Sequence, residues 1–287
     1  MPTVAIVTDS IASIPENLLA SLNIHTVPYY LHRGAEVLRD LVNIDRASFY
    51  RWLSNASELP TTASPGPGDY VDLYTRLAEQ GAVEIASIHI TSKGSGAYQA
   101  ALAAKDLLAE SLPQVRVEVI DTLNVSMCQG WMAIEAARAA LAGASLADIT
   151  ALVKRMLPDT HMIQTADTLK YLYMGGRIGR AKRLLGSLLN IKPLIGMEDG
   201  VIQALGVARS RKLAYQAMVD MIEKAVQTGQ QIKIAYTHAA ALEEAEKLRE
   251  LVRQRLNIAE DLFAELSPAL GVHSGPGTVG VCYFPVE

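Results

Sequence analysis

The chain has 287 residues, of which half are hydrophobic and a fifth are charged, and its formal net charge is −4 at pH 7. This composition excludes a disordered or fibrous protein and provides enough residues for two cores. The acidic balance argues against a general nucleic-acid-binding protein, so we expect no nucleic-acid partner. The longest apolar runs are shorter than the roughly eighteen residues of a membrane span, so we expect no integral membrane segment.

Cys128 and Cys282 are the two cysteines, and neither belongs to a CxxC or Cys/His spacing. This usage predicts a reducing compartment and no structural metal. The first residues read as a buried strand rather than a signal peptide. We therefore expect a cytoplasmic protein that binds no metal ion.

The first half of the chain alternates predicted strands and helices. Apolar runs predict strands over 3–7, 24–31, 83–90 and 115–120. Capping residues and periodicity predict helices over 15–22, 45–52 and 145–156, one that follows Tyr98 and ends at 112, and one that follows Gly130 and reaches about 142. Another is predicted to begin near residue 69. Such alternation is typical of a parallel sheet with helices on its faces. Residues 1–158 are interpreted as a Rossmann-like α/β domain.

A proline-rich loop over 59–69 separates two of these predicted helices. Its three prolines fix the backbone and hold the hydroxyls of Thr61, Thr62 and Ser64 in place. The functional interpretation is a set of hydroxyls positioned for a ligand. The alternative is a surface turn that caps the following helix.

A glycine-flanked serine follows the predicted strand 83–90. Gly94, Ser95 and Gly96 stand between that strand and the next helix, an arrangement that brings backbone N–H groups and a hydroxyl to an anion. The spacing matches neither a P-loop nor a G-x-S-x-G nucleophile elbow. We interpret it as a cradle for a carboxylate or phosphate; the alternative is a glycine turn required only for packing.

The segment after the predicted strand 161–165 combines a helix, a break and a basic turn. Asp167 is predicted to cap the helix, and Gly175, beside Gly176, is predicted to end it in the left-handed conformation. Four basic residues follow, Arg177, Arg180, Lys182 and Arg183, and then an apolar run over 184–195. The functional interpretation is that the basic turn binds an anionic head group while the apolar run forms a wall for a hydrophobic tail. The alternative is an ordinary helix-turn-helix surface.

The remaining residues predict a mixture of hairpin and crossover connections. Strands over 190–197 and 201–207 flank Asp199-Gly200, a hairpin signal, and further strands are expected over 232–236 and 279–284. Helices are expected after the basic cluster 209–212 and over 242–256. Residues 159–287 are therefore interpreted as an α+β domain, in which His273 lies in a glycine-proline loop.

The alternative function, from a different class, is a serine hydrolase or lipid-modifying enzyme that uses Ser95 and His273. Ser95 and His273, with Asp9 or Asp121, contain the residue types of a catalytic triad. Sequence alone does not show that these side chains meet.

Six blocks in order give the chain a family resemblance: TDS, PTT, SKGSGAYQAA, VIDT…SMCQG, DTLKYLYMGGRIGRAK and HSGPG. Together they resemble the DegV family along essentially the whole chain. The resemblance implies two α/β domains with a fatty acid at their junction, the acyl chain in the C-terminal domain. It also implies a non-enzymatic carrier that presents the carboxylate to an ATP-dependent kinase subunit, which forms an acyl phosphate for phospholipid synthesis. No cofactor other than the bound fatty acid is implied.

The resemblance also implies roles for individual residues. The expected carboxylate-binding residues are Thr62, Ser95, Gly96, Arg177 and His273, with Thr61 and Ser274 as possible additions. Arg209 and Arg211 match basic residues implicated in meeting the kinase. The chain departs from the family pattern at Ala63, Gly94, Ala97 and Cys128, which bears on head-group contact and on the acyl chain that fits.

A simple estimate separates the roles of tail and head. Burial of about sixteen methylenes at about 0.8 kcal/mol each contributes on the order of 12 kcal/mol gross. Each hydrogen bond to a charged head group contributes about 1.5–3 kcal/mol. The tail is therefore expected to supply affinity, whereas the hydroxyls orient the carboxylate.

Overall fold

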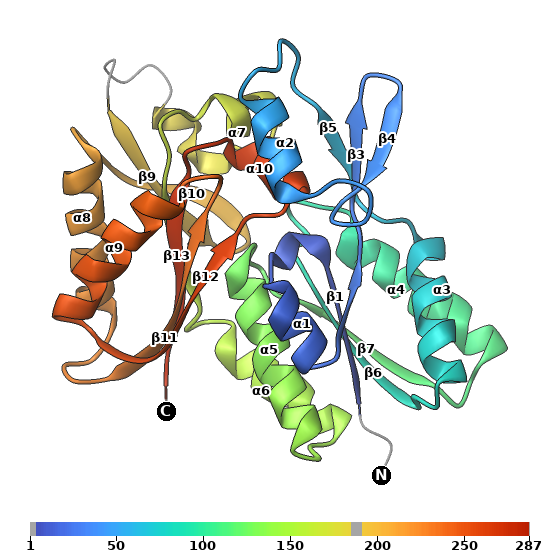
Figure 1. Ribbon diagram of the computed structural model, residues 1–287. Coiled ribbons are helices and arrows are strands. Elements are labelled where there is room, and N and C mark those ends of the chain that lie inside the picture. The colour runs from blue at the N-terminus through green and yellow to red at the C-terminus, as the bar shows by residue number, and fades with distance from the viewer. Residues whose placement is uncertain (1–3, 185–190, 287) are drawn as a thin grey trace.

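The structure is a computed structural model that describes residues 4–184 and 191–286 (Figure 1). Helices and sheets alternate across the molecule in five layers, and the two large sheets lie on either side of a central helical layer. This is an α/β fold with one parallel and one mixed sheet, as predicted.

The first large sheet is parallel and has the order β2-β1-β6-β7. Its strands are β1 (Ala5–Asp9), β2 (Ile24–Val27), β6 (Glu84–His89) and β7 (Arg116–Asp121). One face packs against α3 (Pro67–Glu79) and α4 (Ala97–Ser111). The other packs against α1 (Glu16–Ser21), α5 (Met127–Leu141) and α6 (Leu146–Met156). The central strands β1 and β6 are buried on both faces, which explains why their sequences are mostly apolar.

The second large sheet is mixed and has the order β10-β9-β8-β13-β11-β12. Its strands are β8 (His161–Thr165), β9 (Lys192–Glu198), β10 (Val201–Ala208), β11 (Gln231–His238), β12 (Asn257–Glu265) and β13 (Val279–Pro285). Its outer face is covered by α8 (Arg211–Ala225) and α9 (Leu242–Arg255). The predicted hairpin is confirmed: Asp199 and Gly200 both have positive φ, as a two-residue type I′ turn requires.

Helix α5 joins the two sheets because it is buried on nearly all sides. The indole N–H of Trp131 donates to the carbonyl of Cys282 on β13 at 3.1 Å, and the Cys128 side chain is fully buried beside them. Burial raises the pKa of the Cys128 thiol, so this cysteine is a small core residue. We propose a domain division at residues 158/159, which falls between α6 and β8.

A small third sheet, β4-β3-β5, corrects the prediction of one strand over 24–31. β2 ends at Val27, and β3 (Tyr30–Arg33) pairs instead with β4 (Glu36–Arg39) and β5 (Thr61–Ala63). Pro28 lies between β2 and β3, where it cannot donate a ladder hydrogen bond. The proline-rich loop also differs from expectation, because its residues 61–63 form the edge strand β5.

Two local predictions around α7 (Lys170–Met174) are wrong. Asp167 does not cap the helix; its carboxylate instead binds Lys192 and Arg211 at 2.5 and 2.7 Å. Gly175 is right-handed, and Gly176 takes the left-handed conformation with φ +71°. The N–H groups of Gly176 and Arg177 bond to the carbonyls of residues 173 and 172, the pattern of a Schellman motif. The basic turn continues as the short helix η2 (Gly179–Leu184).

His273 also differs from expectation, because it lies in a helix rather than a loop. Helix α10 (Pro268–Ser274) starts after Ser267, whose hydroxyl accepts from the Leu270 N–H, and has Pro268 at its first position. Together with α2 (Arg46–Leu53), it lies above the first sheet. Among the described residues, no helix is long and apolar enough to cross a membrane.

Candidate functional site

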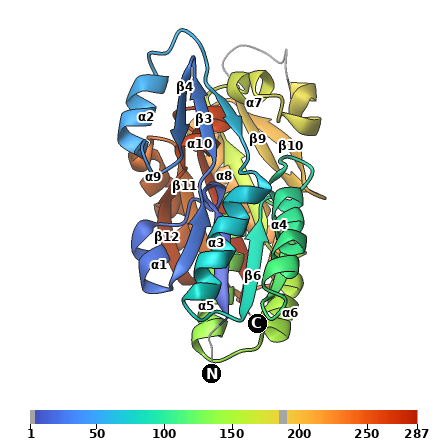
Figure 2. The same cartoon turned by 90° about the vertical axis from the view of Figure 1, so that its right-hand side faces the viewer.

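A cavity of about 260 Å³ lies between the two large sheets. Ile11, Ile90 and Val125 follow the carboxyl ends of β1, β6 and β7 and form one wall. This is the edge of a parallel sheet at which ligands usually bind. Residues of β8, β9 and β10 form the opposite wall. In Figure 2, α7 and β9 lie in the upper part of the molecule, above β6 of the first sheet.

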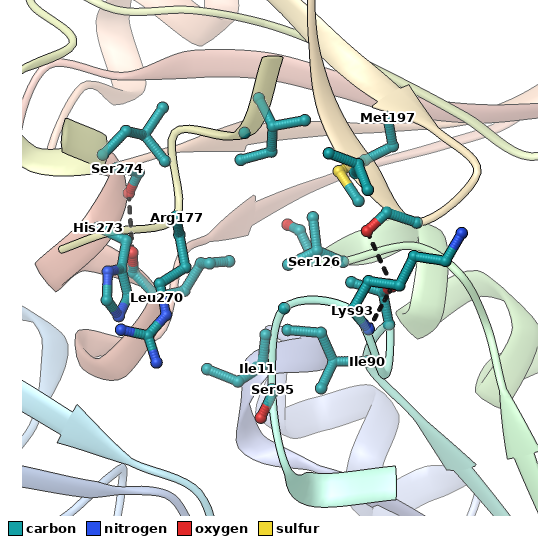
Figure 3. A pocket seen from close by; sticks show the side chains of 18 of the residues that line it. Ile11, Ile90, Lys93, Ser95, Ser126, Arg177, Met197, Leu270, His273 and Ser274 are labelled. Carbon is teal, nitrogen blue, oxygen red and sulfur yellow. Dashed lines mark hydrogen bonds between the residues drawn. The ribbon is translucent and has the colours of Figure 1, made fainter. Parts of the chain in front are cut away.

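One end of the cavity is polar and brings together most of the predicted site residues (Figure 3). The predicted residues that line the cavity are Thr62, Ser95, Gly96, Arg177, His273 and Ser274. Thr61 does not line it, because successive residues of β5 point to opposite faces and Thr61 is exposed. Arg209 and Arg211 also lie outside the lining.

Thr62 and His273 form one pair at the polar end. The Oγ1 of Thr62 and the Nε2 of His273 are 2.8 Å apart, whereas His273 Nδ1 is buried and has no partner among the described residues. A proton on Nδ1 would be a buried unpaired donor, which costs about 1–3 kcal/mol. We therefore assign the proton to Nε2, which donates to Thr62. This leaves the Thr62 hydroxyl hydrogen as a donor to the cavity.

Ser95 and Tyr29 form a second pair. The two hydroxyls are hydrogen-bonded, and the Ser95 oxygen also accepts from the Ala97 N–H at 3.3 Å. Tyr29 is buried after the β2–β3 switch, and no other hydroxyl partner for it occurs among the described residues. With Tyr29 as donor, both lone pairs of Ser95 are used. The remaining group of Ser95 is its O–H, which can donate to a ligand.

The start of α4 adds positive potential to the polar end. Ser95 and Gly96 immediately precede this 15-residue helix, with Gly96 at its N-cap. A β-carbon at Gly96 would lie 3.2 Å from the Ser64 hydroxyl, so glycine keeps this approach open. The positive end of the helix dipole favours an anion at this position.

Arg177 places a guanidinium at the mouth of the same end. It is exposed, and its Nη1 donates to the Gly175 carbonyl at 2.7 Å. Gly175 also allows His273 to approach α7, because a β-carbon there would lie 2.2 Å from His273 Nδ1. Burial and, second, Arg177 lower the pKa of His273 to about 4. His273 is therefore neutral at pH 7, which is consistent with a proton on Nε2 and none on the buried Nδ1.

Buried contacts from the N-terminal half hold α10 in position. The Ala269 N–H donates to Asp40 Oδ1 at 3.1 Å, and the Tyr50 hydroxyl donates to the Leu266 carbonyl at 3.0 Å. Burial raises the pKa of Asp40 to about 6. These contacts connect the orientation of His273 to elements more than 200 positions away in the sequence.

The rest of the cavity is mainly apolar. Its aliphatic and thioether lining consists of Ile11, Ile90, Val125, Met162, Leu172, Ile195, Met197, Val201, Ile202 and Leu270. Of the wall expected over 184–195, Ile195 lines the cavity, and residues 185–190 lie outside the described residues. The arrangement suits an amphipathic anion, with the anion beside Ser95 and the tail between the sheets.

Comparisons with known proteins show the family to which the chain belongs. The family model described as an uncharacterised protein of the DegV family matches residues 3–286. The chain belongs to the DegV family. A DegV domain-containing protein from Caldanaerobacter subterraneus subsp. tengcongensis is 31% identical over 283 residues, which cover 99% of both chains. Protein DegV from Bacillus subtilis is 31% identical over 281 residues, which cover 98% of both.

Solved structures of DegV-family proteins share the fold. A fatty-acid-binding DegV family protein from Thermus thermophilus has a TM-score of 0.91 and 30% identity, over 99% of this chain and 100% of that one. DegV from Bacillus subtilis, described as a fatty-acid-binding protein, has a TM-score of 0.87 and 29% identity over all of both chains. A stearic-acid-binding protein from Eubacterium ventriosum has a TM-score of 0.89 and 25% identity over 98% of both chains.

Of the four residues at which the chain departs from the DegV sequence pattern, one lines the cavity. Gly94 lines it, and a β-carbon there would lie 3.3 Å from the Thr91 methyl group. Ala97 is fully buried and does not line the cavity. Ala63 on β5 and Cys128 in α5 are also outside the lining.

The two arginines expected to meet a kinase are in different environments. Arg209 is exposed. Arg211 is held by Asp167 and donates to the Gly277 carbonyl at 2.6 Å. Burial lowers the pKa of Arg211, but its bonds to Tyr215 and Asp167 outweigh this effect, so that the pKa is raised. Arg211 therefore connects the start of α8 to the loop after α10, which leaves Arg209 as the accessible cation of the pair.

The triad considered for a hydrolase is not assembled. His273 binds Thr62 rather than Ser95. Asp9 instead contacts buried His89, with 3.1 Å between Oδ2 and Nδ1, whereas Asp121 accepts from the N–H groups of residues 92 and 123. Within residues 4–184 and 191–286, no cluster of three or more His, Cys, Asp or Glu residues is suited to a metal ion.

Several polar residues that line the cavity were not predicted as site residues from the sequence. Tyr29, Thr91, Lys93, Ser126 and Gln164 all line the cavity. Lys93 and Thr91 bond to the carbonyls of Asp199 and Gly200 at the β9–β10 turn, at 2.7 and 2.9 Å. These contacts join segments more than 100 positions apart. Pro28 is the sequence feature that could have indicated the position of Tyr29, because it marks the change from one sheet to another.

Proposed function

We propose that the protein binds a long-chain fatty acid, with its carboxylate at the polar end of the cavity and its chain between the two sheets. The observation that carries the proposal is the pair of hydroxyls, on Thr62 and Ser95, whose oxygens are already bonded and whose hydrogens remain for an acceptor. A carboxylate offers two acceptor oxygens and no donor, so it matches this arrangement. Arg177 supplies the opposite charge.

The apolar part of the cavity supports an acyl chain as the rest of the ligand. Two DegV structures described as fatty-acid-binding, and a structure described as stearic-acid-binding, share the fold over nearly the whole chain. Burial of the chain contributes more free energy than the head group, on the order of 10 kcal/mol gross for a long alkyl tail. The polar end then determines which way the ligand lies.

Lipid extraction tests this proposal. The purified protein is denatured and extracted with organic solvent, and the extract is analysed by mass spectrometry beside an unrelated protein purified in the same way. We expect an enriched long-chain acid, and a rise in melting temperature when a fatty acid is added to delipidated protein. Absence of both the enriched acid and the thermal shift would refute fatty-acid binding.

We further propose that the bound carboxylate is presented to an ATP-dependent kinase subunit. This step rests on the family resemblance of the sequence, and it is supported by exposure of Arg177 and Gly96 at the carboxylate end. The carboxylate oxygen would form a bond to the γ-phosphorus while the bond to ADP breaks, giving an acyl phosphate. The present chain would position the acceptor, which is the main requirement of phosphoryl transfer.

Hydroxylamine trapping tests the presentation step. The loaded protein is incubated with ATP and a candidate kinase subunit from the same organism, and acyl phosphate is converted to a hydroxamate. We expect hydroxamate only when protein, kinase, ATP and fatty acid are all present, with less product from Arg209→Ala. A kinase that forms as much product from free fatty acid alone would contradict presentation.

A further inference from the structure

Ser126 places an unpaired hydroxyl in the cavity, away from the predicted carboxylate site. The residue is 2% exposed, it lines the cavity, and its Oγ has no hydrogen-bond partner among the described residues. Figure 3 shows Ser126 between the group formed by Arg177 and His273 and the side chain of Met197. The hydroxyl therefore faces the space that the proposed function gives to the acyl chain.

The backbone conformation of Ser126 is also unusual. Its φ is 58° and its ψ is −144°, a conformation that residues with a β-carbon rarely adopt. Ser126 is the N-cap of α5, where a serine hydroxyl normally accepts from the first turn of the helix. Here the side chain makes no such bond. Both the strained backbone and the missing cap leave the hydroxyl free for another partner.

A second polar side chain lines the same cavity from the opposite sheet. Gln164 on β8 is 7% exposed, and its amide forms no hydrogen bond with the residues that the structure describes. Ser126 also lies at the positive end of the 15-residue helix α5. A hydroxyl, an amide and a helix N-terminus together suit an oxygen-containing group that can both accept and donate hydrogen bonds.

A plain alkyl chain does not satisfy these groups. Val125, Met162 and Met197, which also line the cavity, have side chains that offer no strong hydrogen-bond partner to Ser126 or Gln164. A methylene placed beside them would leave the buried Ser126 hydroxyl and the Gln164 amide without a hydrogen-bond partner, which is unfavourable. An oxygen substituent on the chain would pair with them and would keep the tail buried.

We propose that the preferred ligand is a long-chain fatty acid with a hydroxyl or keto group along its chain, which binds Ser126 and Gln164. This inference rests on the proposed fatty-acid binding and specifies its ligand class. One neutral hydrogen bond gained in a buried site corresponds to about tenfold in affinity. The position of the oxygen along the chain is set by the separation of Ser126 from the carboxylate site.

Competition binding with matched ligands tests the inference. Octadecanoic acid and the positional isomers of hydroxyoctadecanoic acid displace a fluorescent fatty acid from delipidated protein. The wild type is compared with Ser126→Gly, which removes the hydroxyl and suits the positive φ, and with Ser126→Thr, which keeps a hydroxyl. We expect one isomer to bind wild type about tenfold more tightly than octadecanoic acid, and Ser126→Gly to lose this preference.

The outcomes separate this inference from the proposed function. If octadecanoic acid binds but no hydroxylated isomer binds more tightly, the inference is wrong and fatty-acid binding stands. The same conclusion follows if Ser126→Gly retains the preference. If neither the plain nor the hydroxylated acids displace the probe, both the inference and the proposed function are wrong.

Discussion

The hydroxyls of Tyr29 and Ser95 are hydrogen-bonded at the polar end of the cavity. Burial raises the pKa of Tyr29 well above its ordinary value, so the phenol stays protonated and can donate. The bond uses a lone pair of Ser95 and directs the serine hydrogen elsewhere. In the proposed site, Tyr29 would therefore act on the carboxylate through Ser95, as a positioning residue.

Tyr29→Phe is expected to weaken fatty-acid binding by about twofold to tenfold, the effect of one neutral hydrogen bond. The adjacent Tyr30→Phe is a matched control, because the Tyr30 hydroxyl donates to Asp69 outside the cavity lining. Displacement of a fluorescent fatty acid measures both affinities. Equal affinities of the two variants would show that Tyr29 does not position Ser95.

Thr62→Val is expected to lower affinity about tenfold to a hundredfold, because it removes a hydrogen bond to a charged group worth about 1.5–3 kcal/mol. Valine keeps the β-branched shape that suits strand β5. Thr61→Val makes the same change on the exposed face of that strand and should leave affinity unchanged. Calorimetric titration of both variants distinguishes the two faces; a larger loss in Thr61→Val would contradict the assignment.

His273 is expected to titrate near pH 4 in the ligand-free protein, because burial disfavours its charged form. Since this pKa lies below the unfolded value of about 6.5, the contribution of His273 to stability is complete above that value and is lost as pH falls toward 4. A bound carboxylate should raise the pKa. Heteronuclear NMR of the ring protons, assigned with His273→Gln, measures it; titration near 6.5 without ligand would disagree with the buried geometry.

Gly175→Ala is expected to displace His273, because the new β-carbon would lie 2.2 Å from Nδ1. We expect a stability loss of about 1–3 kcal/mol and weaker fatty-acid binding. Gly68→Ala is the control, since no atom lies within 4 Å of its β-carbon and its φ is not positive. Urea unfolding and probe displacement report the two effects. If Gly175→Ala matched its control in both, α7 and α10 would not be as close as described.

Asp40 is expected to make stability fall between pH 4 and 7. Its folded pKa of about 6 lies above the unfolded value near 3.8, so the folded state binds more protons in this window. Relative to Asp40→Asn, the wild type should lose on the order of 2 kcal/mol of unfolding free energy from pH 4 to pH 7. Urea unfolding of both proteins at each pH tests this; parallel profiles would show that Asp40 does not titrate there.

Local signals predicted much of the fold and the candidate site. Capping and apolar periodicity located most helices and strands, and glycine-flanked Ser95 marked a helix start that lines the cavity. The Asp199-Gly200 turn was also predicted correctly, because both residues favour positive φ. These features depend on neighbouring residues, so the sequence carries them directly.

Features that depend on distant contacts were not predictable in this way. An apolar run over 24–31 does not reveal that its second half pairs with residues 61–63. Asp167 has the residue type of a helix cap, yet two cations that are distant in sequence engage its carboxylate. The left-handed residue was placed one position early, because Gly175 and Gly176 are locally equivalent and only the approach of His273 distinguishes them.

Carbon-13 NMR of a fatty acid labelled at its carboxyl carbon tests the central claim most directly. We expect one bound resonance at one equivalent of ligand, with a chemical shift that changes in Thr62→Val and Ser95→Ala but not in Thr61→Val. A bound resonance that is the same in all four proteins would place the carboxylate away from Thr62 and Ser95. The absence of any bound resonance would contradict fatty-acid binding itself.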